Sequence, residues 1–132
     1  MSARDGRNRM HINEITEQVI GAAIEVHRQL GPGLLESTYE ECLARELALR
    51  GIPFERQKPV PLKYKGVDVD AGFRMDFLVA GQVVVELKAV DSLQPIHDAQ
   101  VLTYPKLTGV RIALLMNFNT KVLAKGIRRI AL

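Results

Sequence analysis

Residues 74–88 read RMDFLVAGQVVVELK, two apolar runs separated by an Ala-Gly pair. This pattern predicts a β-hairpin. Strand residues alternate between faces, so Glu86 and Lys88 share one face. If three residues connect the strands, or a bulge lies at Gly81, Asp76 falls opposite Glu86. Two carboxylates and an ammonium group are therefore expected to converge.

Opposed carboxylates need a partner, because facing like charges destabilise a hairpin and an unpaired buried charge costs more. A divalent cation between Asp76 and Glu86 would remove both penalties. The chain has one cysteine and no paired histidines, so oxygen ligands favour Mg²⁺ or Mn²⁺ over zinc. The alternative is an exposed ion pair of Lys88 with the two acids.

Patterns on both sides of the hairpin predict a mixed β-sheet covered by helices. Prolines keep residues 54–64 at a sheet edge or in extended loops, since proline cannot donate to a central ladder. Residues 121–132 fit either a short helix or a last strand. Periodicity predicts helices at residues 14–30, 35–50 and 94–104, and strands at 73–79, 82–90 and 110–118.

The length of 132 residues fits one domain, with 47% hydrophobic and 25% charged residues. We expect a flexible N-terminal segment at residues 1–12 and a single domain at residues 13–132. The longest apolar runs are far shorter than the ~20 residues of a membrane helix. The single cysteine, Cys42, agrees with a reducing compartment, so we expect a cytoplasmic location.

The hairpin residues resemble a known motif: Asp76 followed by Glu86-Leu87-Lys88 is similar to the PD-(D/E)XK nuclease motif. Residues 33–39, GLLESTY, resemble the signature of the GxxExxY proteins, a bacterial and archaeal branch of that superfamily. The resemblance runs from about Asn13 to Ile130. It implies an α/β fold of the restriction-endonuclease-like type, a mixed β-sheet flanked by α-helices.

The resemblance also implies roles at the hairpin. Asp76 and Glu86 would ligate the metal, with the backbone carbonyl of Leu87 as a third oxygen ligand. Lys88 would neutralise charge that develops on the phosphate, or orient and deprotonate the attacking water. The cofactor would be Mg²⁺ or Mn²⁺, which acts as a Lewis acid.

Three residues outside the hairpin are implied by the same resemblance. Glu36 resembles an additional acidic residue of the site, although a carboxylate in the first turn of a helix also favours the helix dipole. Gln100 and Tyr104 resemble a Gln-x-x-x-Tyr element beside the site, or form a polar helix border. Pro105 removes an N–H group and is expected to kink the last turn, which would displace Tyr104.

Two aromatic side chains and the cysteine are interpreted as structural. His27 lies in an apolar helical arc, which is typical of a hydrogen-bonded core histidine rather than a ligand. Tyr39 lies on an apolar stripe and is interpreted as a packing residue. Cys42 is interpreted as a small buried hydrophobic residue.

Residues 99–132 contain six basic and no acidic side chains. This region is a candidate nucleic-acid-binding surface, with a solvated surface as the alternative. The candidate contacts are Lys121, Lys125, Arg128 and Arg129.

The predicted function is a metal-dependent nuclease that acts on nucleic acid, with DNA favoured. The alternative is a noncatalytic nucleic-acid-binding or assembly module that keeps the nuclease fold. The resemblance also implies a homodimer, because cleavage of both strands of a duplex often requires two sites.

Overall fold

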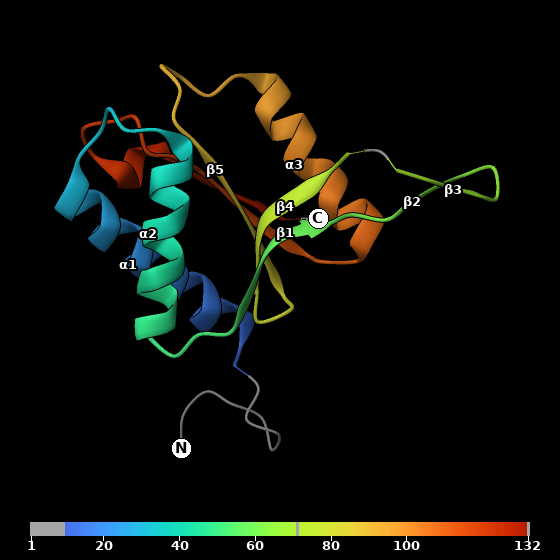
Figure 1. Cartoon of the computed structure of the whole chain (residues 1–132), viewed down its shortest axis with the longest axis horizontal. Coiled ribbons are helices and arrows are strands. Elements are labelled where there is room, and N and C mark those ends of the chain that lie inside the picture. The colour runs from blue at the N-terminus through green and yellow to red at the C-terminus, as the bar shows by residue number, and fades with distance from the viewer. Residues whose placement is uncertain (1–9, 71, 132) are drawn as a thin grey trace.

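The computed structural model describes residues 10–70 and 72–131. The chain folds into three α-helices, one short 3₁₀ helix and seven strands within these ranges (Figure 1). The helices are α1 (Ile12–Leu30), α2 (Glu36–Leu49), α3 (Pro95–Thr108) and the 3₁₀ helix η1 (Leu123–Gly126). The strands are β1 (Phe54–Pro59), β2 (Leu62–Tyr64), β3 (Val67–Val69), β4 (Arg74–Val79), β5 (Val83–Lys88), β6 (Ile112–Asn117) and β7 (Ile127–Ala131).

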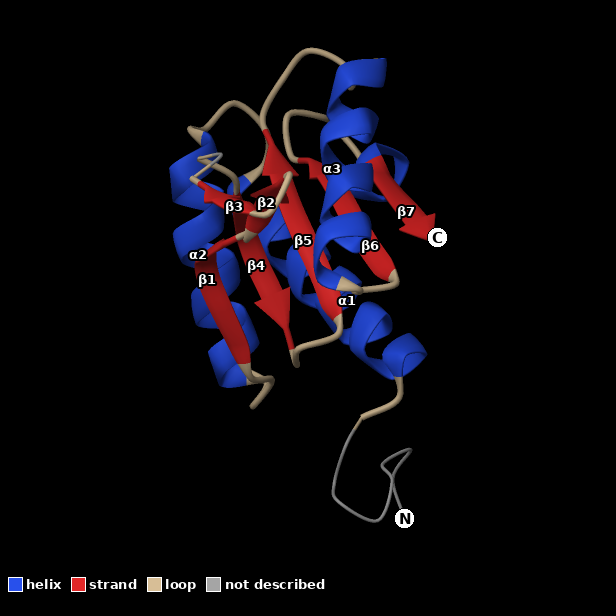
Figure 2. Cartoon of the chain, turned by 90° about the vertical axis from the view of Figure 1, so that its right-hand side faces the viewer, coloured by secondary structure: helices blue, strands red, loops and turns tan. Residues whose placement is uncertain are grey.

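Five strands form the main sheet in the order β1-β4-β5-β6-β7 (Figure 2). β5 and β6 are parallel, and the other neighbouring pairs are antiparallel. α3 makes the crossover between the parallel pair, as parallel strands require. The predicted mixed sheet flanked by helices is confirmed. β2 and β3 form a separate small hairpin that projects from the body (Figure 1).

The two faces of the sheet carry separate cores. α1 and α2 cover one face and α3 covers the other (Figures 1 and 2). Val83, Val85 and Leu87 belong to the core under α1 and α2, and Val84 belongs to the core under α3. β5 is thus buried on both faces, which explains its nearly continuous apolar sequence.

The helix boundaries differ from the predicted ones at two capping sites. α1 starts at Ile12 with His11 as its N-cap, and not after Asn13. The Asn13 side chain instead accepts a 2.9 Å hydrogen bond from Arg129. α3 continues through Pro105 to Thr108, and its cap Gly109 has a left-handed backbone and donates its N–H to the Pro105 carbonyl.

The remaining segments were only partly predicted. β1 lies at a sheet edge, as the prolines indicated, and the tail contains both a short helix and a strand. The β2–β3 hairpin was not predicted, because three-residue strands are too short to show periodicity. Met10 packs against the core, whereas most of the segment predicted to be flexible lies outside the described residues. Among the helices described, none has both the length and the apolar character needed to cross a membrane.

Candidate active site

The register of the β4–β5 hairpin brings the two predicted acids together. The paired residues include Phe77 with Val85 and Val79 with Val83, so residues 80–82 form a three-residue connection, one of the two alternatives that the sequence allowed. Continued by one residue beyond Phe77, this register places Asp76 opposite Glu86.

Next to this position, side-chain carboxylates accept hydrogen bonds from backbone N–H groups of the opposite strand, in place of backbone carbonyls. The Asp76 N–H donates to Glu86 Oε2 at 2.7 Å, and the Leu87 N–H donates to Asp76 Oδ2 at 2.8 Å. Each side chain therefore binds the backbone of the opposite strand. This reciprocal arrangement fixes both carboxylates where the two strands separate.

The other oxygen of each carboxylate also has a donor. Gln57 Nε2 donates to Asp76 Oδ1 at 3.2 Å, and the Tyr104 hydroxyl donates to Glu86 Oε1 at 3.1 Å. An ionised carboxylate has about four lone-pair sites. All four oxygens are thus oriented by a donor and keep lone pairs that could bind a cation.

The electrostatics of the pair favour a cation. Burial and, to a smaller extent, the neighbouring Asp76 charge raise the pKa of Glu86 to about 8, while Lys88 acts in the opposite direction. Burial and the charge of Glu40 likewise raise the pKa of Asp76. One ammonium group does not balance the negative charge of this site, and a divalent ion would relieve the remaining repulsion.

The donor set fits a magnesium-type ion with two protein carboxylates. Within residues 10–70 and 72–131, no group of three or more His, Cys, Asp or Glu side chains has the geometry to hold a metal. Mg²⁺ commonly binds through one or two carboxylates and keeps several waters. Asp76 and Glu86 meet that requirement.

A comparison with protein-family models matches residues 13–130 to the PD-(D/E)XK nuclease superfamily. The chain belongs to that superfamily. The matched range includes Asp76, Glu86 and Lys88, the residues of the candidate site on the hairpin. Comparisons with curated proteins and with solved structures give no significant match.

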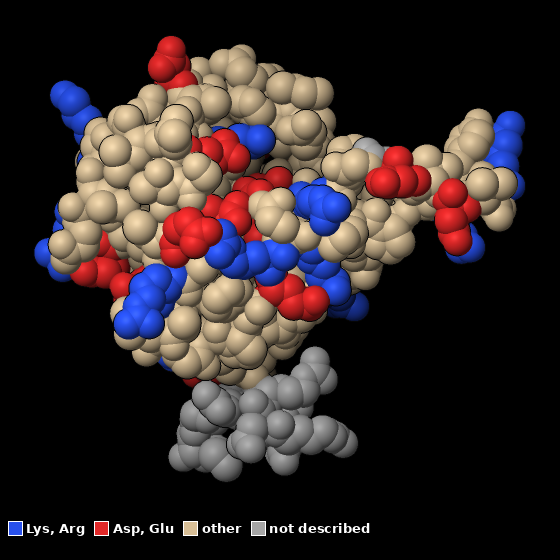
Figure 3. Space-filling model, in the orientation of Figure 1, with Lys and Arg blue, Asp and Glu red and all other residues tan. Residues whose placement is uncertain are grey.

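Lys88 and Glu36, two further predicted site residues, lie close enough to the carboxylate pair for their charges to interact with it. Lys88 ends β5 and is half-buried. Glu36 is exposed at the start of α2. Partial burial raises the pKa of Glu36, the positive charge of Lys88 lowers it, and Asp76 raises it. In Figure 3, acidic side chains gather near the centre of this face, between α2 and α3, with basic side chains beside them.

The two α3 residues are placed differently. Tyr104 is buried and also donates to the Arg74 carbonyl at 3.2 Å. The expected displacement by Pro105 does not occur, because α3 continues for another turn to its glycine cap. Gln100 is exposed one turn earlier, and no hydrogen bond joins its side chain to Asp76 or Glu86.

Sequence reasoning missed a polar cluster between α2 and β1. Glu40 accepts hydrogen bonds from Gln57 at 2.8 Å and from Arg56 at 2.8 Å. Glu40 follows Glu36 by four residues, so one helical turn could have indicated that both acids face the site. Nothing local indicated Gln57, because its contact with Asp76 depends on the pairing of β1 with β4.

The positions of His27 and Tyr39 agree with their interpretation as structural residues, whereas Cys42 is less buried than predicted. His27 Nε2 lies 2.7 Å from the Thr120 carbonyl, inside the core. Tyr39 stacks on Phe118 with ring centroids 4.6 Å apart, and its hydroxyl donates to the Gly31 carbonyl. Cys42 is only half-buried against the core.

The basic residues of the tail do not form one surface. Arg128 pairs with Leu115, which pairs with Glu86, so Arg128 lies on the face of the active site. Arg129 lies on the opposite face, beside α1. Arg128 forms an ion pair with Asp98. Lys121 and Lys125 are exposed in the segment between β6 and β7.

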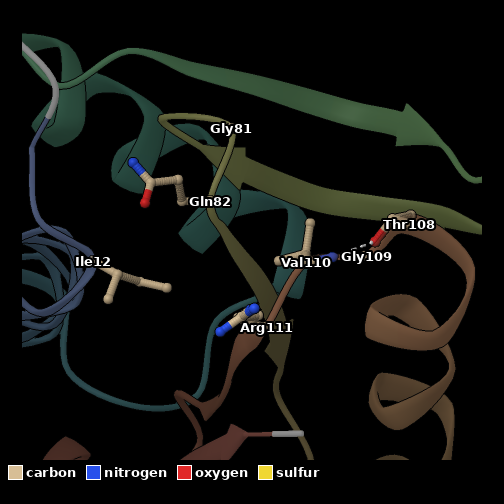
Figure 4. Close-up of a pocket in the computed structure, with 7 residues that line it drawn as sticks. All are labelled: Ile12, Gly81, Gln82, Thr108, Gly109, Val110 and Arg111. Carbon is tan, nitrogen blue, oxygen red and sulfur yellow. Dashed lines mark hydrogen bonds between the residues drawn. The ribbon is translucent and has the colours of Figure 1, made fainter. Parts of the chain in front are cut away.

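The structure has a pocket near each end of the parallel strand pair. One of about 230 Å³ lies between the loops after β5 and β6 and includes Lys125, Arg128 and Asn117, the residue paired with Lys88. The other, of about 240 Å³, lies near the hairpin turn around Gly81 (Figure 4). No carboxylate lines the second pocket, so it is not a candidate metal site.

Proposed function

We propose that this protein is a metal-dependent nuclease, a phosphodiesterase that acts on nucleic acid, with DNA as the favoured substrate. The observation that carries the proposal is the reciprocal hydrogen bonding of Asp76 and Glu86 across the hairpin. The buried Glu86 and the half-buried Asp76, held face to face in this way, weaken the metal-free fold and suit a divalent cation.

The positions of the side chains support the following roles. Asp76 and Glu86 would hold Mg²⁺ or Mn²⁺, with the Leu87 carbonyl as a third oxygen ligand. When bound, such an ion supplies Lewis-acid activation of the phosphate and lowers the pKa of a coordinated water. The Lys88 ammonium would stabilise negative charge on the phosphate oxygens in the transition state, or orient the attacking water.

Three further residues are proposed to support the same chemistry. Tyr104 orients Glu86 through its hydroxyl. The charges of Lys88 and Asp76 both shift the pKa of Glu36, so Glu36 is proposed to lie beside the metal or its bound waters. Gln100 is exposed on the same helix as Tyr104 and is available to contact substrate at the rim of the site.

The proposed substrate path runs from the carboxylates towards the loops after β5 and β6. Arg128 lies on the active face, and Lys125 and Arg128 both line the pocket beside Asn117. Lys121 would extend this path. Arg129 was predicted to bind with them, but it lies on the other face and would contact only a nucleic acid that wraps around the sheet edge.

Three finer assignments remain part of the proposal. The GLLESTY segment supports membership of the GxxExxY branch. A homodimer is expected if the enzyme cuts both strands of a duplex. The cytoplasmic location rests on the single cysteine, Cys42.

Cleavage of end-labelled DNA and RNA, single- and double-stranded, tests the proposal. We expect products with Mg²⁺ or Mn²⁺, none with a chelator, none from Asp76→Asn, and at least about 10²-fold slower cleavage by Lys88→Ala at equal protein concentration. If the wild type binds nucleic acid without cleaving any of these substrates under any metal condition, the noncatalytic module replaces the nuclease.

A further inference from the structure

Gln57 has an uncommon backbone conformation in the middle of β1. Its φ is 50°, in the left-handed region that non-glycine residues rarely occupy. The flanking residues keep a regular register, with Arg56 opposite Phe77 and Lys58 opposite Met75. The unusual residue is therefore the one level with Asp76. Non-glycine residues in this region tend to cluster at functional sites.

The Gln57 side chain connects two carboxylates from different elements. Its Nε2 atom donates to Glu40 Oε1 at 2.8 Å and to Asp76 Oδ1 at 3.2 Å. Both acceptors are carboxylate oxygens, so the NH₂ end of the amide must face them. One neutral donor thus holds Asp76 and separates it from the like charge on α2.

The arrangement around Asp76 has a counterpart around Glu86. Each carboxylate has one oxygen bound to a backbone N–H of the opposite strand. The second oxygen is held by a side chain from a different element, Gln57 for Asp76 and Tyr104 for Glu86. Groups that hydrogen-bond to ligating carboxylates typically tune metal affinity by 10- to 100-fold.

We propose that Gln57 is a positioning residue that orients Asp76 for metal binding and keeps Glu40 apart from it. Gln57 is not itself a ligand, because its nitrogen and not its oxygen faces the carboxylates. The inference rests on the proposed metal site, and it adds a residue that the nuclease motif does not contain.

The test is the dissociation constant of Mn²⁺, measured by titration calorimetry, for the full chain and two variants. Gln57→Gly accepts the left-handed backbone without strain and removes the amide. Gln57→Asn tolerates that backbone and keeps an amide, but it is one methylene too short to bridge both carboxylates. Each should weaken Mn²⁺ binding about tenfold or more, with metal-free melting temperatures within a few degrees of wild type.

Lys58→Ala is the matched control, because its ammonium contacts Glu55 and not the site, and its Mn²⁺ affinity should equal that of the wild type. If wild type binds Mn²⁺ and both Gln57 variants bind equally well, the positioning role is wrong and the proposed nuclease stands. If both variants unfold, Gln57 is a folding residue and the inference also fails. If wild type itself binds no Mn²⁺, the proposed function fails first.

Discussion

The two ends of the β4–β5 hairpin are built differently. At the turn, backbone groups pair directly: Val79 lies opposite Val83, and the Gln82 N–H donates to the Val79 carbonyl at 3.0 Å. At the open end, carboxylates replace those backbone partners. The turn end is apolar and buried on both faces, whereas the open end holds opposed charges. The turn end therefore stabilises the fold. This stability allows the open end to hold two opposed carboxylates, which lower the stability of the fold.

Lys88→Ala tests the open end with the largest expected effect. Loss of a charge that stabilises only the transition state should lower the cleavage rate by about 10²- to 10³-fold. Metal binding should persist, since the lysine is not a ligand. Cleavage rates and a Mn²⁺ titration on the same preparation check both statements, and a simultaneous loss of metal binding would contradict this separation of roles.

The pH dependence of stability tests the charge at the open end. The pKa of Glu86 is about 8 in the fold, above its ordinary value of 4.5. A raised pKa contributes stability that is present below pH 4.5 and is lost as the pH rises through 8. The metal-free wild type should therefore lose stability relative to Glu86→Gln between about pH 5 and 8, on the order of a few kcal/mol.

Chemical denaturation of both proteins across this range measures the difference. Saturating Mg²⁺ should reduce the dependence for the wild type, because the bound cation compensates the ionised acid. A constant difference between the two proteins from pH 5 to 8 would show that Glu86 is not perturbed.

Val83→Ala tests the turn end. The side chain is fully buried, and removal of two methyl groups should lower the free energy of unfolding by about 2 kcal/mol. Mn²⁺ affinity should stay at the wild-type value at temperatures where the variant is folded. A large loss of affinity would mean that the two ends are not independent.

The smallest expected effect concerns the two arginines of β7. Arg128→Gln and Arg129→Gln remove the same charge from opposite faces of the sheet. The first should weaken binding to nucleic acid of any sequence and lower the slope of log affinity against log salt by about one. The second should change neither quantity. Equal losses from both variants would mean that both faces contact nucleic acid, and no change in either variant would assign both residues to a solvated surface.

The sequence was most informative where structure depends on neighbours along the chain. Alternation and a three-residue connection were enough to place Asp76 opposite Glu86, since only ten positions separate them. Gln57 and Glu40 could not be found in this way. Their contacts need β1 to pair with β4 and α2 to pack over β1, and both depend on tertiary packing.

In residues 121–132, by contrast, the sequence was a poor guide to which basic side chains lie together. Charge counting grouped Arg128 with Arg129, although adjacent residues of a strand must lie on opposite faces. The tail fitted a helix or a strand equally well, and that ambiguity hid the separation. Tyr104 was also misjudged, because the effect of Pro105 was weighed without the extra turn that follows it.

Thermal unfolding with and without millimolar Mg²⁺ or Mn²⁺ tests most directly whether Asp76 and Glu86 form one metal site. A ligand that binds only the folded state raises the melting temperature by mass action. We predict a rise for wild type and for Lys88→Ala, and none for Asp76→Asn or Glu86→Gln. A wild-type melting temperature that does not respond to either ion would contradict the central claim.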